Sequence, residues 1–112
     1  MDSVTMAHHH DKLEWSETKD ATEETQRICD QVKGQVEKQT GKNYGEFKAV
    51  KYRENVGKEL FLIKVHVGGA DYIHLRVIQF IWLLRCVPQE VDILSGVEQH
   101  KTKDDPLVPF KI

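Results

Sequence analysis

The spacing of apolar residues changes from a helical to a strand period near Gly41. Upstream of it, three aliphatic residues recur every four positions in an otherwise polar stretch: Ile28, Val32 and Val36. This spacing predicts a helix with one narrow apolar face that packs on another layer. Thr22 can cap the helix, the two acidic residues after it suit the positive end of the helix dipole, and Gly41 can end it.

Downstream of the helix, apolar and polar positions alternate. Over 47–52 the apolar phase slips by one residue, which predicts a bent strand with a β-bulge. Segments 61–67 and 73–77 alternate on either side of a glycine-rich turn, which predicts an antiparallel pair. Further strands are expected around 91–97 and, as an edge strand because of the neighbouring prolines, around 107–110. The fold class is therefore α+β, with one α-helix packed on a four- to five-stranded antiparallel β-sheet.

Residues 1–19 have no periodic pattern. They mix charges, a histidine triplet and isolated apolar residues, so we expect a flexible N-terminal arm at 1–19 and one folded domain at 20–112. Adjacent imidazoles on a mobile arm hold a transition metal only weakly, so we predict no native metal site there.

Charge and composition exclude several classes of function. The formal charge is −2, with no basic block, which argues against a nucleic-acid partner. The start of the chain has no features of a secretion signal, and the longest apolar run is too short to span a bilayer, so we expect a cytoplasmic protein with no membrane association. In that reducing compartment, Cys29 and Cys86 are expected to be free thiols.

The sequence carries none of the common catalytic signatures. The chain contains no GxSxG, HExxH, Walker-type loop or GxGxxG, so we predict that it is not an enzyme and needs no cofactor. Cys29 follows Ile28 on the helix, where a thiol that fills space is expected. His66 and His74 fall on neighbouring strands without a third ligand nearby, so we interpret them as surface residues of the sheet.

Several stretches carry a resemblance to a known family. The most specific are Phe61-Leu62-Ile63-Lys64-Val65-His66-Val67-Gly68 and Tyr72-Ile73-His74-Leu75-Arg76-Val77, and the resemblance extends upstream through Trp15 to Glu24 and downstream through Lys101 to Asp105. In order and spacing they resemble the stefin branch of the cystatins, which are reversible inhibitors of papain-like cysteine proteases. The resemblance implies a cystatin-like fold whose N-terminal arm and two hairpin loops form a wedge that enters the protease cleft.

The resemblance assigns three protease-binding regions to this chain. The first is the arm, at Leu13 and Glu14. The second is the first hairpin loop, at Glu54, Asn55, Val56, Gly57 and Lys58. The third is the second loop, at Val87 and Pro88.

Each region departs from the family pattern. The arm lacks the family's glycine, the first loop keeps only Val56 of Gln-Val-Val-Ala-Gly, and the Val87-Pro88 pair is displaced by about six positions relative to the family's Leu-Pro. The segment 80–86 causes that displacement. Both burial of this segment and exposure at the wedge edge are consistent with its composition.

The resemblance and the altered regions together are consistent with two functions. The first is reversible, non-covalent inhibition of papain-like cysteine proteases such as cathepsins, weakened by the altered edge loops. The alternative is a non-inhibitory protein-binding module with a stefin fold. The expected state is a monomer, and a dimer formed by hairpin exchange is the open alternative.

Overall fold

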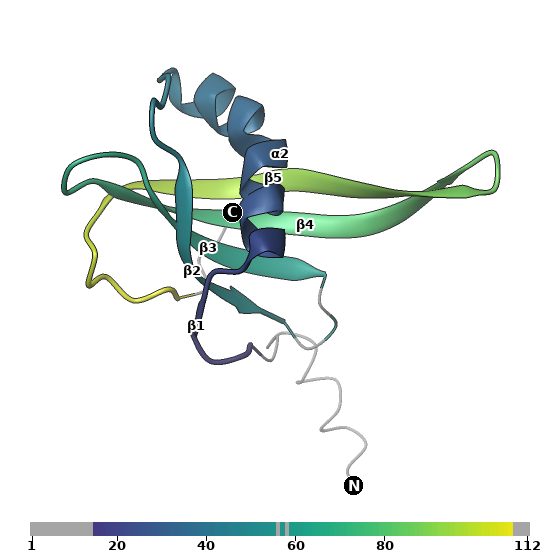
Figure 1. Cartoon of the computed structure of the whole chain (residues 1–112), viewed down its shortest axis with the longest axis horizontal. Coiled ribbons are helices and arrows are strands. Elements are labelled where there is room, and N and C mark those ends of the chain that lie inside the picture. Colours follow the sequence, from purple (N-terminus) through teal and green to yellow (C-terminus); the bar gives the residue numbers. More distant parts are fainter. Residues whose placement is uncertain (1–14, 56, 58, 109–112) are drawn as a thin grey trace, which may run out of the picture.

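The computed structural model describes residues 15–55, 57 and 59–108, with the backbone alone at 82 and 84. Its elements, in chain order, are β1 (Lys19–Asp20), α2 (Glu23–Thr40), β2 (Lys48–Glu54), β3 (Leu60–His66), β4 (Tyr72–Leu84) and β5 (Val87–Lys101). The strands form one antiparallel sheet in the order β1-β2-β3-β4-β5. Helix α2 crosses one face of this sheet (Figure 1). The predicted α+β architecture is confirmed.

Helix α2 begins and ends where the sequence predicts. Thr22 is the N-cap, and its side chain accepts a hydrogen bond from the backbone N–H of Thr25. Gly41 ends the helix with φ 74°, a left-handed conformation in which glycine has no steric cost. The buried helix residues are Thr25, Ile28, Cys29, Val32 and Val36. The four apolar residues among them pack on the inward side chains of the sheet, such as Ile63 and Leu75.

Local strand features also match the sequence pattern. The β2–β3 register shifts between Ala49 and Lys51, which confirms the predicted bulge. The turn between β3 and β4 contains Gly68 and Gly69, both with positive φ. It is closed by a hydrogen bond from the Val67 N–H to the Asp71 carbonyl, 3.1 Å long. These features fix the register of the central strands.

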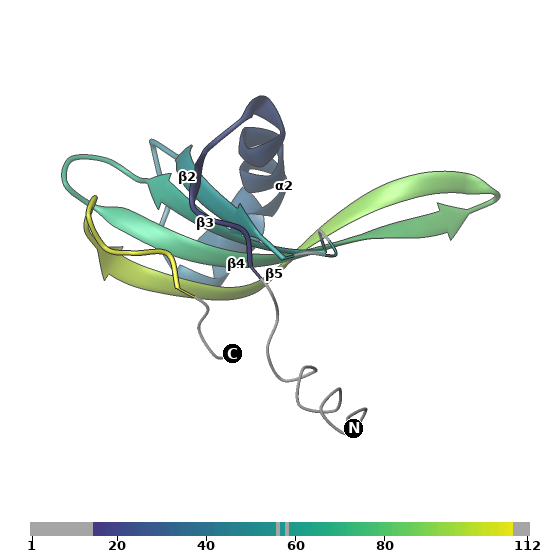
Figure 2. The same cartoon turned by 90° about the horizontal axis from the view of Figure 1, so that it is seen from below.

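The C-terminal segment 102–108 covers part of the other sheet face (Figure 2). The Lys64 ammonium donates to the carbonyl of Lys103 at 2.7 Å, and Leu107 is 3% exposed. Leu62, which points to the face opposite the helix, is therefore fully buried. Every residue from Phe61 to Val65 is buried because both faces of β3 are covered.

Two predictions made for this face are wrong. Leu107 and Val108 form no strand, and the remainder of the predicted strand 107–110 lies outside the described residues. His74 was expected on the sheet surface but is only 1% exposed. It lies opposite Lys64 in the β3–β4 ladder, beneath the C-terminal segment, whereas His66 lies opposite Tyr72.

Strands β4 and β5 continue as a two-stranded ribbon beyond the rest of the sheet (Figure 1). Strand β3 starts at Leu60, opposite Ile78, whereas β4 remains paired with β5 as far as Leu84 and Val87. At about 3.3 Å per residue, the ribbon extends roughly 20 Å past the start of β3. Ile81 is 60% exposed and Leu83 is 69% exposed. The open question of segment 80–86 is thus resolved as exposure, for the side chains that are described.

Candidate functional site

The root of the N-terminal arm lies against the first hairpin loop. Trp15 forms an isolated antiparallel bridge with Asn55. The Ser16 N–H donates to the Glu54 carbonyl at 2.8 Å, and the Glu54 N–H donates to the Ser16 hydroxyl at 3.1 Å. Trp15 and Ser16, the root of the arm, therefore meet the start of the first loop at one edge of the sheet. Leu13 and Glu14, which directly precede Trp15 in sequence, lie outside the described residues.

Asn55 holds the base of the first loop. Its side-chain oxygen accepts hydrogen bonds from the N–H groups of Glu59 and Leu60, at 2.8 and 3.0 Å, and its own N–H donates to the Leu60 carbonyl. The residue is 6% exposed. Asn55 therefore shapes the loop from inside. Gly57 is exposed, whereas Val56 and Lys58 lie outside the described residues.

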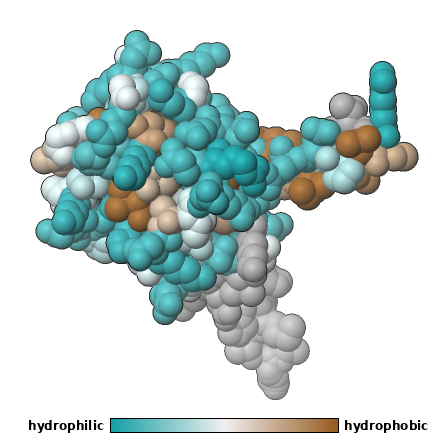
Figure 3. Space-filling model, viewed as in Figure 1, coloured by the Kyte–Doolittle hydropathy of each residue, from teal (hydrophilic) through white to brown (hydrophobic). Residues whose placement is uncertain are grey.

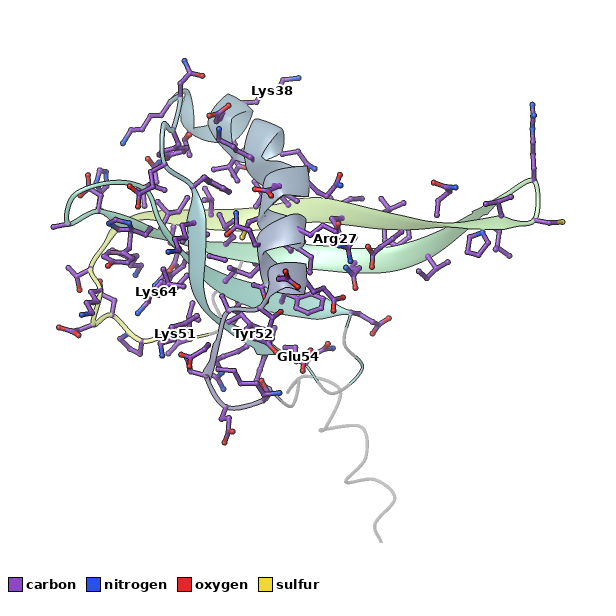
Figure 4. All side chains as sticks on the ribbon, in the orientation of Figure 1. Arg27, Lys38, Lys51, Tyr52, Glu54 and Lys64 are labelled. Atoms are coloured by element: carbon purple, nitrogen blue, oxygen red, sulfur yellow. The ribbon has the colours of Figure 1, made fainter. Side chains whose placement is uncertain are left out.

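Glu54 is the last residue of β2 and lies opposite Phe61. Its carboxylate is 3.3 Å from the ammonium of Lys19, and its side chain is 17% exposed. Lys19 also lies over the ring of Tyr52, 5.9 Å from its centre. Figure 4 shows Glu54 and Tyr52 together near the first turn of α2. The charge of Glu54 is therefore neutralised within the sheet.

The third predicted region lies apart from the other two. Val87, opposite Leu84, is the first residue after the turn at the ribbon tip and is 51% exposed. Because the ribbon continues past the start of β3, Val87 and Pro88 lie beyond the edge where the arm root meets the first loop (Figure 1). The structure brings the arm root and first loop together and leaves Val87-Pro88 at a distance.

Arg53 is a site residue that the sequence did not reveal. Its Nε donates to the Ser16 carbonyl at 2.8 Å, and its Nη1 donates to the Leu107 carbonyl at 2.7 Å. One guanidinium thus fixes the arm root to the C-terminal segment. Both acceptors are main-chain oxygens, so no side-chain pattern could have indicated the contact.

Other chemistry finds little support in the described part of the chain. The described residues contain no cluster of three side chains able to hold a metal ion, and no described helix could cross a membrane. Cys29 and Cys86 are free thiols. Burial raises the pKa of Cys29 to about 12, which keeps this thiol protonated and unreactive.

Comparison with known proteins identifies relatives along most of the chain. No protein-family model matches. The chain is 42% identical to leukocyte cysteine proteinase inhibitor 1 of Sus scrofa over 98 residues. The matched region covers 85% of this chain and 89% of that protein. The chain is also 42% identical over 99 residues to cystatin-B of Homo sapiens, covering 85% and 94%.

A third relative, cystatin-A1 of Sus scrofa, is 42% identical over 96 residues. These are names of inhibitors rather than of enzymes, which agrees with the prediction that this chain is not an enzyme. The chain therefore belongs to the stefin branch of the cystatin family.

Proposed function

We propose that the protein is a reversible, non-covalent inhibitor of papain-like cysteine proteases, of the cathepsin type, acting in the cytoplasm. Its relatives include a protein named as a cysteine proteinase inhibitor. The observation that carries the proposal is the bridge between Trp15 and Asn55. It places the arm root beside the first loop, as a wedge that fills a cleft with both segments requires.

Inhibition by such a wedge needs no reacting group. The arm and loop occupy the sites that substrate would fill, so affinity depends on apolar contact and on how little order is lost upon binding. Asn55 lowers that cost because it accepts two hydrogen bonds across the base of the loop. Glu54 adds no unpaired charge, since Lys19 neutralises it.

The proposal is tested by titrating papain and a lysosomal cathepsin with the purified protein. We expect competitive, reversible inhibition. Val56→Asp should raise the inhibition constant at least about tenfold, because a charge at the loop would lose its hydration in the cleft. Gln39→Asp is the matched control: its neighbour Lys38 lies in the last turn of α2, at the opposite end of the helix from Glu54 (Figure 4). No inhibition by a demonstrably folded protein would exclude the proposal.

One observation favours the second candidate, a non-inhibitory binding module. The ribbon continues beyond the edge that would enter a cleft, so it can collide with a protease before the first loop is seated. A variant lacking 80–83 and 88–91 shortens both strands equally and preserves the pairing register. A second variant combines Glu14→Gly with Lys58→Gly. If either variant inhibits papain and the parent does not, the parent chain is a non-inhibitory module. Inhibition by the parent excludes this candidate.

A further inference from the structure

The turn at the ribbon tip shows which backbone groups of β4 point away from β5. Arg85 and Cys86 have φ of 54° and 65°, as in a two-residue type I′ turn, which is closed by a hydrogen-bonded pair. That pair is Leu84 and Val87. Because hydrogen-bonded and non-hydrogen-bonded pairs alternate, the N–H and C=O groups of Ile81 and Leu83 point away from β5.

Two contacts at the base of the ribbon confirm this alternation. The N–H of Gln79, at the same phase as Ile81, donates outward to the carbonyl of Glu59 at 2.7 Å. On the other strand, the carbonyl of Asp92 accepts a hydrogen bond from the side chain of Gln35 on helix α2. Beyond Gln79, no segment within the described ranges pairs with the outer edge of β4.

The two edges of the ribbon differ in their capacity to pair with another strand. Three features protect the outer edge of β5. Pro88, at an outward position, has no N–H to donate, and Glu90 forms an ion pair with Arg27. Further along, the side chain of Gln35 bonds to the backbone at Asp92 and Leu94. On β4, the segment from Gln79 to Leu84 carries no charge. The outer edge of β5 is therefore protected, whereas the outer edge of β4 is open.

The faces of the ribbon also expose apolar surface. On one face lie Ile81 and Leu83, 60% and 69% exposed, and on the other lies Phe80, 37% exposed. Figure 3 shows hydrophobic residues gathered along this projection. A two-stranded ribbon is only marginally stable by itself, whereas three or more strands with an apolar face are stable. Additional strands paired with β4 would therefore stabilise the ribbon.

We propose that the ribbon is a self-association surface: β4 of one molecule pairs antiparallel with β4 of a second copy about a twofold axis at residue 82. In this register Ile81 lies opposite Leu83 of the second copy, and Leu83 lies opposite Ile81 of that copy, so the pairing uses only backbone groups beyond Gln79, whose own N–H is bonded to Glu59. The outward backbone groups then face each other, and no like charges are opposed. The outer edge of β5 cannot pair in this way, because Pro88 lacks an N–H donor and because Glu90 would lie near Glu90 of the second copy.

The test is sedimentation equilibrium over a concentration series, on a Cys86→Ser background so that the exposed Cys86 cannot form intermolecular disulfides. We expect the parent to approach the dimer mass. Ile81→Pro removes an N–H that the monomer does not use but the dimer uses twice, so it should raise the dissociation constant at least about tenfold. Circular dichroism checks that the variant folds.

Glu90→Pro is the matched control, because Glu90 is paired directly with Ile81 and its N–H points to the opposite edge. It should leave the dimer intact. Should Ile81→Pro fail to fold, Ile81→Lys replaces it, since each copy would then bring a charge into the apolar surface that pairs. The proposal is overturned if the parent stays monomeric, if the dimer survives a folded Ile81 variant, or if Glu90→Pro alone abolishes it. A dimer that survives an Ile81 variant would indicate another interface, such as hairpin exchange.

Discussion

His74 lies directly opposite Lys64 in the β3–β4 ladder, and both side chains are buried, at 1% and 6% exposure. Lys64 donates to the carbonyl of Lys103, whereas neither ring nitrogen of His74 has a hydrogen-bond partner within the described part of the chain. Burial, followed by the charge of Lys64, lowers the pKa of His74 to about 4. Burial also lowers the pKa of Lys64.

This pair predicts that stability falls in mild acid. The unfolded chain binds a proton at His74 near pH 6.5, but the folded chain does so only near pH 4. The free energy of unfolding is therefore unaffected by His74 above pH 6.5 and decreases between pH 6.5 and 4, by up to about 3 kcal/mol. Urea unfolding of the parent and of His74→Leu across this range measures the difference.

The charged groups around His74 define the control for that experiment. Besides Lys64, they are Lys101 and Glu98 on β5 and Asp105 on the C-terminal segment. His66→Gln serves as the control, because a hydrogen bond to the Gly69 carbonyl raises the pKa of His66 instead. Parallel pH profiles for the parent and His74→Leu would contradict the prediction.

Leu107→Ala should loosen the cover over His74. Leu107 is 3% exposed, so its truncation should destabilise the fold by about 2–3 kcal/mol. It should also raise the pKa of His74 towards 6.5, because water would reach the ring. NMR titration of the imidazole measures this change. Val108→Ala, at a residue that is 48% exposed, should alter neither quantity. An unchanged His74 pKa in Leu107→Ala would show that other residues keep the ring dry.

Asn55→Ala should weaken both the fold and the proposed inhibition. The substitution leaves the N–H groups of Glu59 and Leu60 without their acceptor, at a cost of about 1–2 kcal/mol in stability. The loop would then be ordered only on binding, which raises the inhibition constant for papain. Asn43→Ala, at an exposed position, is the control. Lower stability with unchanged inhibition would mean that loop order does not contribute to binding.

Arg85→Asn combined with Cys86→Gly should stabilise the ribbon. Both native residues adopt a left-handed conformation that is strained for most side chains and favourable for Asn-Gly. We expect the free energy of unfolding to rise by about 1 kcal/mol. Amide hydrogen exchange at the ribbon tip should slow. Cys86→Ser retains the strain and should show neither effect; equal exchange rates in all three proteins would refute the explanation.

The helix and central strands were predictable because their signals are local. Thr22, Gly41 and the phase slip near Val50 each act through neighbouring residues. Burial of His74 was not predictable, because it depends on a segment about thirty residues away in sequence that is held through the carbonyls of Lys103 and Leu107. Every residue has a main-chain carbonyl, so the residue type does not indicate which carbonyl accepts such a hydrogen bond.

The candidate site was predictable in part for the same reason. Asn55 and Gly57 indicate a turn by their own preferences, whereas the bridge from Trp15 to Asn55 joins distant residues. The position of Val87 and Pro88 depended on whether 80–84 stays paired with β5. An uncharged apolar run is compatible with a buried strand and with an exposed one, so its sequence could not decide between them.

The two hydrogen bonds of Arg53 have a consequence for chain connectivity. Because one guanidinium binds the carbonyls of both Ser16 and Leu107, the described chain begins and ends at the same place on the molecule. A short glycine-serine linker could therefore join these ends, and new termini could be opened at the exposed turn of Arg85 and Cys86. The fold would then be encoded by a circularly permuted sequence in which every strand keeps its neighbours.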